Sequence, residues 1–142
     1  MKNSGIRLRL LLVEDDDDFR EVLAERLVRA GFDVEPAFDF ESALDCLGGK
    51  PFDVVVSDYR LSGDATGLHL LRHLRTAADK TPFLLMSGSL DFDQMDLIRP
   101  VGVDLISKPF PAESLVIKIM LLIQSVRIDG ENVSAAGAKY VG

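Results

Sequence analysis

The chain has 142 residues, 47% of them hydrophobic, so it can bury one core of ordinary size but not two folded domains. Its net charge of -7 and isoelectric point near 4.7 argue against direct binding to nucleic acid or an anionic membrane, because both require basic patches. Cys46 is the only cysteine, which excludes an internal disulfide and a cysteine-rich metal site. The start of the sequence resembles no signal peptide and no apolar run has membrane-spanning length, so we expect a soluble, cytoplasmic protein with protein partners.

Apolar patterning predicts strands and helices that alternate along the chain. Short apolar runs, typical of strands covered on both faces, are separated by segments whose apolar residues recur every three or four positions, typical of helices. Pro36 marks the second strand as an edge strand, because proline cannot donate a ladder hydrogen bond. The predicted strands are 8–13, 32–37, 52–57, 81–86 and 101–107, and the predicted helices begin at Asp16 or Asp17, Asp39, Gly67 and Pro111.

These elements predict one folded domain over residues 8–126. It follows a short lead of residues 1–7, and the Gly-, Ser- and Ala-rich segment 127–142 is expected to be a flexible tail or the start of a linker. A weak helical pattern within 88–100 indicates a further short helix. The alternation of strands and helices predicts an α/β fold with a five-stranded parallel sheet wound on both sides.

Polar side chains follow four of the apolar runs at the point where each run ends. Glu14 and Asp15 follow the first run, Asp58 the third, Ser87 the fourth and Lys108 the fifth. In a doubly wound sheet, ligands bind at the carboxyl ends of the strands, so these side chains should meet at one edge. Two carboxylates about 4 Å apart repel by roughly 4 kcal/mol at an effective dielectric near 20, which favours a bound cation. The set therefore predicts a phosphoryl-accepting pocket that binds a divalent metal, and Mg²⁺ suits its hard oxygen ligands.

Four short motifs in this order resemble the receiver domain of two-component response regulators. The resemblance covers nearly the whole chain, from roughly Leu8 to Val126, and implies a flavodoxin-like sheet of strand order 2-1-3-4-5 with about five helices. The motifs are Val13-Glu14-Asp15-Asp16, Val56-Ser57-Asp58-Tyr59-Arg60-Leu61, Leu85-Met86-Ser87-Gly88 and Ser107-Lys108-Pro109-Phe110.

The resemblance implies a role for each polar residue at the predicted edge. Asp58 would accept the phosphoryl group from a phosphohistidine on a sensor kinase or phosphotransfer protein, and Lys108 would balance its charge. Ser87 would contact the phosphoryl group through its hydroxyl. The resemblance also implies a cis bond between Lys108 and Pro109, an isomer found in about 5–6% of such bonds.

The resemblance also implies a set of Mg²⁺ ligands. Asp15 and Asp58 would bind the ion directly, Glu14 would hold it through water, and the backbone carbonyl of Arg60 would add a further ligand. A carboxylate attacks a phosphoryl group poorly because both are negative, so metal and lysine together would supply the missing positive charge.

The sequence departs from the family pattern where the output signal usually originates. In the family that the chain resembles, the position of Leu105 usually holds an aromatic residue, which responds to movement of the hydroxyl at the position of Ser87. The last predicted helix is also apolar around most of its circumference. We therefore expect residues 88–126 to form a homodimer or to dock an output partner.

Two other functions remain open from the sequence. An aspartyl-phosphate phosphohydrolase would carry a second acid two residues after the nucleophile, where this chain has Arg60. A binding module of the same fold that has lost phosphorylation would not need the intact acidic set. His69 and His73 are expected to be solvent-exposed rather than metal-binding or phosphorylated. The favoured interpretation is a receiver domain, not an enzyme with its own substrate.

Overall fold

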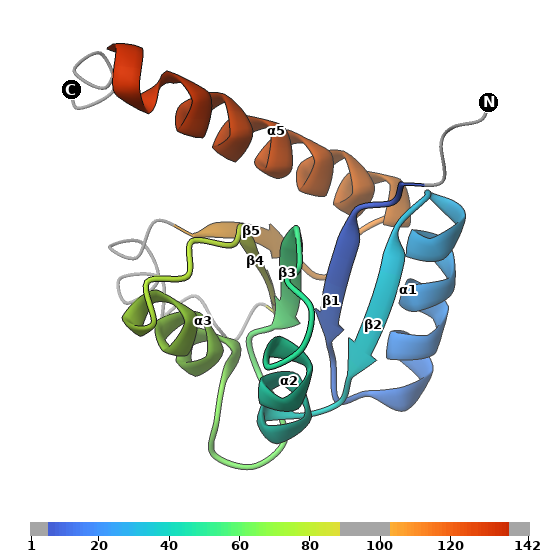
Figure 1. Ribbon diagram of the computed structural model, residues 1–142. Coiled ribbons are helices and arrows are strands. Elements are labelled where there is room, and N and C mark those ends of the chain that lie inside the picture. The colour runs from blue at the N-terminus through green and yellow to red at the C-terminus, as the bar shows by residue number, and fades with distance from the viewer. Residues whose placement is uncertain (1–5, 89–102, 137–142) are drawn as a thin grey trace.

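A single parallel sheet of five strands, in the order β2-β1-β3-β4-β5, forms the centre of the protein (Figure 1). The structure is a computed structural model that describes residues 6–88 and 103–136, with side chains described as far as Val126. The strands are β1 (Arg9–Val13), β2 (Asp33–Ala37), β3 (Val54–Asp58), β4 (Phe83–Ser87) and β5 (Asp104–Ser107). The helices are α1 (Asp17–Arg29), α2 (Phe40–Leu47), α3 (Gly67–Thr76) and α5 (Ala112–Ala136).

The chain reverses its winding direction between β1 and β3. It first leaves β1 for the edge strand β2, then returns past β1 to β3 and continues to β4 and β5. Helices α1 and α5 consequently cover one face of the sheet, and α2 and α3 cover the other (Figure 1). The predicted α/β fold, the strand order and the edge position of β2 are confirmed.

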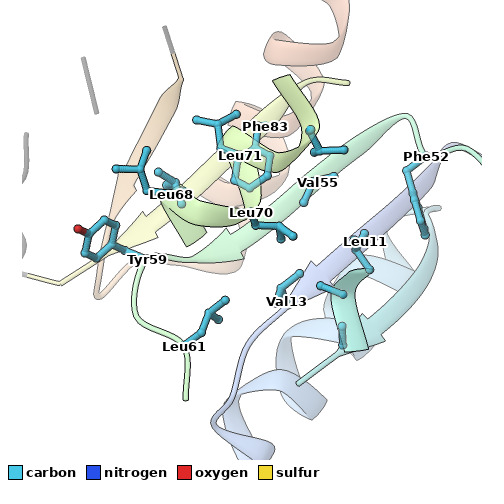
Figure 2. Close-up of a cluster of buried hydrophobic side chains, with 14 residues drawn as sticks. Leu11, Val13, Phe52, Val55, Tyr59, Leu61, Leu68, Leu70, Leu71 and Phe83 are labelled. Carbon is cyan, nitrogen blue, oxygen red and sulfur yellow. The ribbon is translucent and has the colours of Figure 1, made fainter. Parts of the chain in front are cut away.

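Each strand of the sheet contributes to two hydrophobic clusters, because successive side chains point to opposite faces. Leu10 and Leu12 belong to the cluster under α1 and α5, whereas Leu11 and Val13 belong to the cluster under α2 and α3. Figure 2 shows the second cluster, in which Leu70 and Leu71 of α3 lie over the strands. Burying one such leucine contributes about 1.5–3 kcal/mol, so the two clusters hold the strand ends in fixed positions.

Capping side chains begin the helices where the sequence predicts. Asp16, one of the two expected caps, accepts a hydrogen bond from the backbone N–H of Phe19 at the start of α1. Asp39 caps α2 in the same way through Ser42. Gly31 follows α1 with a φ of +107°, a left-handed conformation that side chains rarely adopt, which explains why a glycine ends this helix.

The end of the last helix differs from the prediction. Helix α5 extends to Ala136, ten residues beyond the expected end near Val126. Gly130 costs a helix about 1 kcal/mol relative to alanine, which weakens it without ending it. The role of the segment after Val126 as a linker stays a prediction.

The helix expected within 88–100 lies outside the described residues, as do the start of the fifth predicted strand and residues 137–142. The described part of the chain therefore contains four helices, against the expected number of about five. None of these described helices is both long enough and apolar enough to cross a membrane.

Candidate functional site

The carboxyl ends of the strands bring the predicted polar residues to one edge of the sheet. Asp58 is the last residue of β3 and Ser87 the last of β4, while Glu14 follows β1 directly and Lys108 follows β5 directly. Parallel pairing of β1 with β3 places Val13 beside Ser57, so Glu14 and Asp58 continue two neighbouring strands. The edge predicted from the sequence is therefore the edge at which these residues meet.

An open cavity of about 420 Å³ lies over this edge. Its walls come from the ends of β1 and β3, from the start of α1, and from the segment after β5. The lining residues are Glu14, Asp15, Asp16, Phe19, Asp58, Lys108, Pro109 and Phe110.

The Lys108 ammonium joins two carboxylates at the floor of the cavity. Its Nζ lies 3.2 Å from Oδ1 of Asp58 and 3.3 Å from Oε1 of Glu14. Glu14 is almost completely buried, with 1% of its surface exposed, and its Oε2 accepts a hydrogen bond from the backbone N–H of Asp16 at 3.1 Å. The backbone N–H of Lys108 donates to the carbonyl oxygen of Ser87 at 2.8 Å, which ties the lysine to the end of β4.

Three acids form a group that can hold a metal ion. One carboxylate oxygen from each of Glu14, Asp15 and Asp58 lies within 4.8 Å of the other two. Glu14 and Asp58 are buried, and Asp15 is exposed. Oxygen ligands at this spacing suit Mg²⁺, which takes one or two carboxylates and completes its shell with water and phosphate oxygens. The predicted acidic set therefore comes together and fits the ion.

Burial and mutual repulsion disfavour the ionised form of two of these acids. Burial and the nearby Asp58 carboxylate together raise the pKa of Glu14 to about 7, although the hydrogen bond from Asp16 and the charge of Lys108 act to lower it. Burial also raises the pKa of Asp58, despite the attraction of Lys108. Burial alone would lower the pKa of Lys108, but attraction by Asp58 and Glu14 outweighs it, so this pKa is raised. A cation bound in this pocket would therefore stabilise the ionised forms of Glu14 and Asp58.

Two further predicted site residues, Ser87 and Arg60, are near Asp58 in strand pairing or in sequence, but neither is among the residues that line the cavity. Ser87 is buried at the end of β4. Arg60 lies two residues beyond Asp58, where its backbone pairs with Thr66 in an isolated antiparallel bridge that closes the loop before α3. The Lys108-Pro109 bond is cis, as the resemblance implies. His69 and His73 are exposed on α3, away from the cavity lining.

Sequence reasoning missed two residues of the site. Phe19 of α1 and Phe110 after β5 line the cavity, with their ring centroids 6.2 Å apart. Phe110 belongs to the fourth motif, whereas Phe19 has the spacing of an ordinary apolar residue of the first predicted helix. Its position one turn after the acidic pair, on the helix that starts at the sheet edge, was the signal that could have identified it.

Comparison with known proteins assigns the family. Residues 10–120 match the response regulator receiver domain family. The chain is a receiver domain of this family. This receiver domain is 30% identical over 120 residues to YrkP of Bacillus subtilis, described as an uncharacterised transcriptional regulatory protein, which covers 84% of the chain and 51% of YrkP.

Two further proteins are similar to this receiver domain. The transcriptional activator PfeR of Pseudomonas aeruginosa is 37% identical over 122 residues, which cover 85% of the receiver domain and 39% of PfeR. The chemotaxis response regulator CheY4 of Vibrio cholerae superposes with a TM-score of 0.75 at 26% identity, covering 82% of the receiver domain and 99% of CheY4. The chain thus spans about half the length of YrkP and less of PfeR, but nearly all of CheY4.

Proposed function

We propose that this receiver domain accepts a phosphoryl group on Asp58 from a phosphohistidine donor. An oxygen of the Asp58 carboxylate attacks phosphorus, the bond between phosphorus and the donor histidine nitrogen breaks, and that nitrogen leaves with the bond's electron pair. The observation that carries the proposal is the contact between Lys108 and Asp58 at 3.2 Å, inside a cavity that is also lined by Glu14 and Asp15.

The charges of the site suit this step. The attacking carboxylate and the phosphoryl oxygens are all negative, so the transfer needs fixed positive charge where they meet. Lys108 supplies one such charge at the floor of the cavity, and the end of β5 positions it. The buried hydroxyl residue Ser87 is expected to contact a phosphoryl oxygen from the neighbouring strand.

A bound Mg²⁺ would supply the second positive charge. Asp15 and Asp58 are the proposed direct ligands, Glu14 the acid that holds the ion through water, and the carbonyl of Arg60 a further ligand. The support for this assignment is the spacing of the three carboxylates and the unfavourable charge that they carry without a cation.

Intact-mass measurement with a small phosphoryl donor tests the proposal. The protein incubated with acetyl phosphate or a phosphohistidine donor and Mg²⁺ should gain one phosphoryl group, and Asp58→Asn should abolish the gain. Asp64→Asn is the matched control, since Asp64 is an exposed acid in the loop after β3. Labelling that persists in the Asp58→Asn variant, at His69 or His73, would contradict the proposed acceptor.

The same mass measurement, together with an assay of phosphate release, separates the other two functions. A phosphohydrolase would release inorganic phosphate from a phosphorylated substrate over many turnovers, whereas we propose that this domain has no such substrate and only assists its own phosphorylation and dephosphorylation. A binding module without phosphorylation would show no mass gain at all.

We also propose that a sensor kinase or phosphotransfer protein is the donor and that α5 contributes to the output surface. Leu115, Ile119 and Ile123 fill the core beneath α5, while Ile117 and Leu121 are 59% and 60% exposed. Exposed apolar residues of this size along one helix favour contact with a partner or a second copy. The part of this surface expected within 89–102 lies outside the described residues.

A further inference from the structure

Phe19 is the aromatic side chain that approaches the Lys108 ammonium. The Nζ atom of Lys108 lies 4.9 Å from the centroid of the Phe19 ring. A cation within about 6 Å of an aromatic face is attracted by the negative charge of that face. Phe110 meets the Phe19 ring edge to face, with an interplanar angle of 65°, and restricts its movement. The ring is therefore held beside the ammonium by a second aromatic residue.

The backbone at the start of α1 fixes the position of Phe19 relative to the acids. Its N–H donates to Oδ1 of the capping residue Asp16 at 3.0 Å. The neighbouring Arg20 donates from its guanidinium to the carbonyl oxygen of Glu14 at 2.7 Å. The first turn of α1 is thus tied to the end of β1, which carries Glu14 and Asp15. The backbone of Phe19 is therefore fixed relative to the acids, and the contact with Phe110 restricts rotation of its ring.

Phe19 attracts Lys108 without being able to bind a metal ion. Its side chain is long, flexible and 28% exposed, so it needs contacts that keep it in the cavity. Among the described residues its ionic contacts are Glu14 and Asp58, and both belong to the acidic group that can hold a metal. A cation that neutralises those acids weakens their attraction for the lysine. The face of Phe19 offers no ligand atom, so its attraction for the lysine persists.

We infer that Phe19 is a positioning residue for Lys108. Its ring holds the ammonium beside Asp58, so the positive charge is in place when the phosphoryl group arrives. The effect on phosphorylation rests on the proposed function of Asp58, whereas the placement of the lysine can be measured without any phosphoryl donor.

Nuclear magnetic resonance of the lysine side chain tests the placement directly. A ring face shifts nearby protons upfield, so the protons on Cε of Lys108, assigned by comparison with Lys108→Met, should resonate upfield of those of exposed lysines. Phe19→Leu should remove this shift, and Phe19→Tyr should retain it, with and without Mg²⁺. A Lys108 resonance that Phe19→Leu leaves unchanged would overturn the inference.

A fluorinated series at position 19 tests the electrostatic contact while retaining the shape of the ring. Site-specific mono-, di- and trifluorophenylalanine remove negative charge from the ring face in steps, and a residue that only fills space would tolerate them equally. The rate of Asp58 phosphorylation by phosphoramidate with Mg²⁺ should fall with each fluorine, by about two- to fivefold in total. Phe19→Tyr should keep a rate near that of the unmodified protein.

Phe52 provides the matched control for this series. Its ring centroid lies 4.3 Å from Cζ of Arg9. This contact lies at the amino-terminal ends of β1 and β3, whereas the cavity lies at their carboxyl ends. Fluorination of Phe52 should leave the phosphorylation rate unchanged. A rate that is indifferent to fluorination of Phe19 would refute the positioning role. An unmodified protein that shows the Lys108 shift but no phosphorylation would support the placement and contradict the proposed function instead.

Discussion

Gly67, the first residue of α3, packs directly against the backbone of Asp58. A Cβ added to Gly67 would overlap the carbonyl oxygen of Asp58 and a methyl carbon of Leu85, and would lie 3.0 Å from Oγ of Ser57. The Gly67 N–H also donates a hydrogen bond to the carbonyl oxygen of Tyr59 at 2.8 Å. Gly67 therefore contacts Asp58 and both of its neighbours in the chain, Ser57 and Tyr59. The start of α3 thus packs against the backbone of Asp58, the proposed acceptor, and leaves no room for a side chain at position 67.

Gly67→Ala is expected to destabilise the protein by about 1–3 kcal/mol, because the added methyl group forces backbone to move in a packed region. It should also slow phosphorylation of Asp58 by displacing its carbonyl. Gly48→Ala is the control, since a Cβ there makes only ordinary contacts, the nearest at 3.5 Å. Urea unfolding and phosphorylation rates measured on both variants check this, and equal stability of the two would contradict the close contact at Gly67.

Mg²⁺ should raise the melting temperature of the protein by binding only the folded state. Asp15→Asn should weaken this effect and stabilise the metal-free protein, because it removes one of three neighbouring negative charges. Asp64→Asn should alter neither property. Thermal unfolding at several Mg²⁺ concentrations measures both effects, and a melting temperature indifferent to millimolar Mg²⁺ would count against the metal site.

Glu14 should make the stability of the metal-free protein fall as the pH rises from about 4.5 to about 7. Its folded-state pKa of about 7 lies above the unfolded value of 4.5, so the folded state keeps a proton that the unfolded state loses across this window. The contribution is complete below the unfolded pKa and is lost above the folded one, by roughly 1–3 kcal/mol.

Glu14→Gln should remove this part of the pH dependence, because the amide does not titrate and can still accept the hydrogen bond from Asp16. The difference in unfolding free energy between the two proteins, measured in urea across the window, isolates the contribution of Glu14. A difference that stays constant with pH would show that Glu14 titrates at its ordinary pKa.

Leu121→Glu should weaken self-association or docking of an output partner, since Leu121 is 60% exposed and a charge there opposes burial. The fold should be unaffected. Val22→Glu on α1 is the matched control, because Val22 is an exposed apolar residue of another helix, 54% exposed. Sedimentation with and without beryllofluoride reports the association, and a protein whose assembly ignores the charge at Leu121 would exclude this surface.

The sequence alone was sufficient for the architecture and for the members of the acidic group. Strand and helix patterns are local, because side-chain period and capping depend on residues a few positions apart. Parallel strands place their carboxyl ends at one edge, so Glu14, Asp58 and Lys108 could be assigned to a common site before any distance was known. The end of α5 could not be predicted as well, because composition after Val126 is compatible with either a helix or a linker.

Only the tertiary structure decided how these residues act on one another. Lys108 and Glu14 are 94 residues apart in the chain, and their contact depends on the sheet, in which β3 and β4 lie between β1 and β5 and set the distance between them. The raised pKa of Glu14 follows from burial, which no local pattern specifies. The approach of Phe19 to Lys108 depends on the position of α1 beside the carboxyl ends of the strands. The spacing of Phe19 in the sequence predicts only an apolar helix residue, whereas the structure places it in the cavity lining. Local periodicity determines which segments form, whereas long-range packing determines the distances and burial on which the chemistry depends.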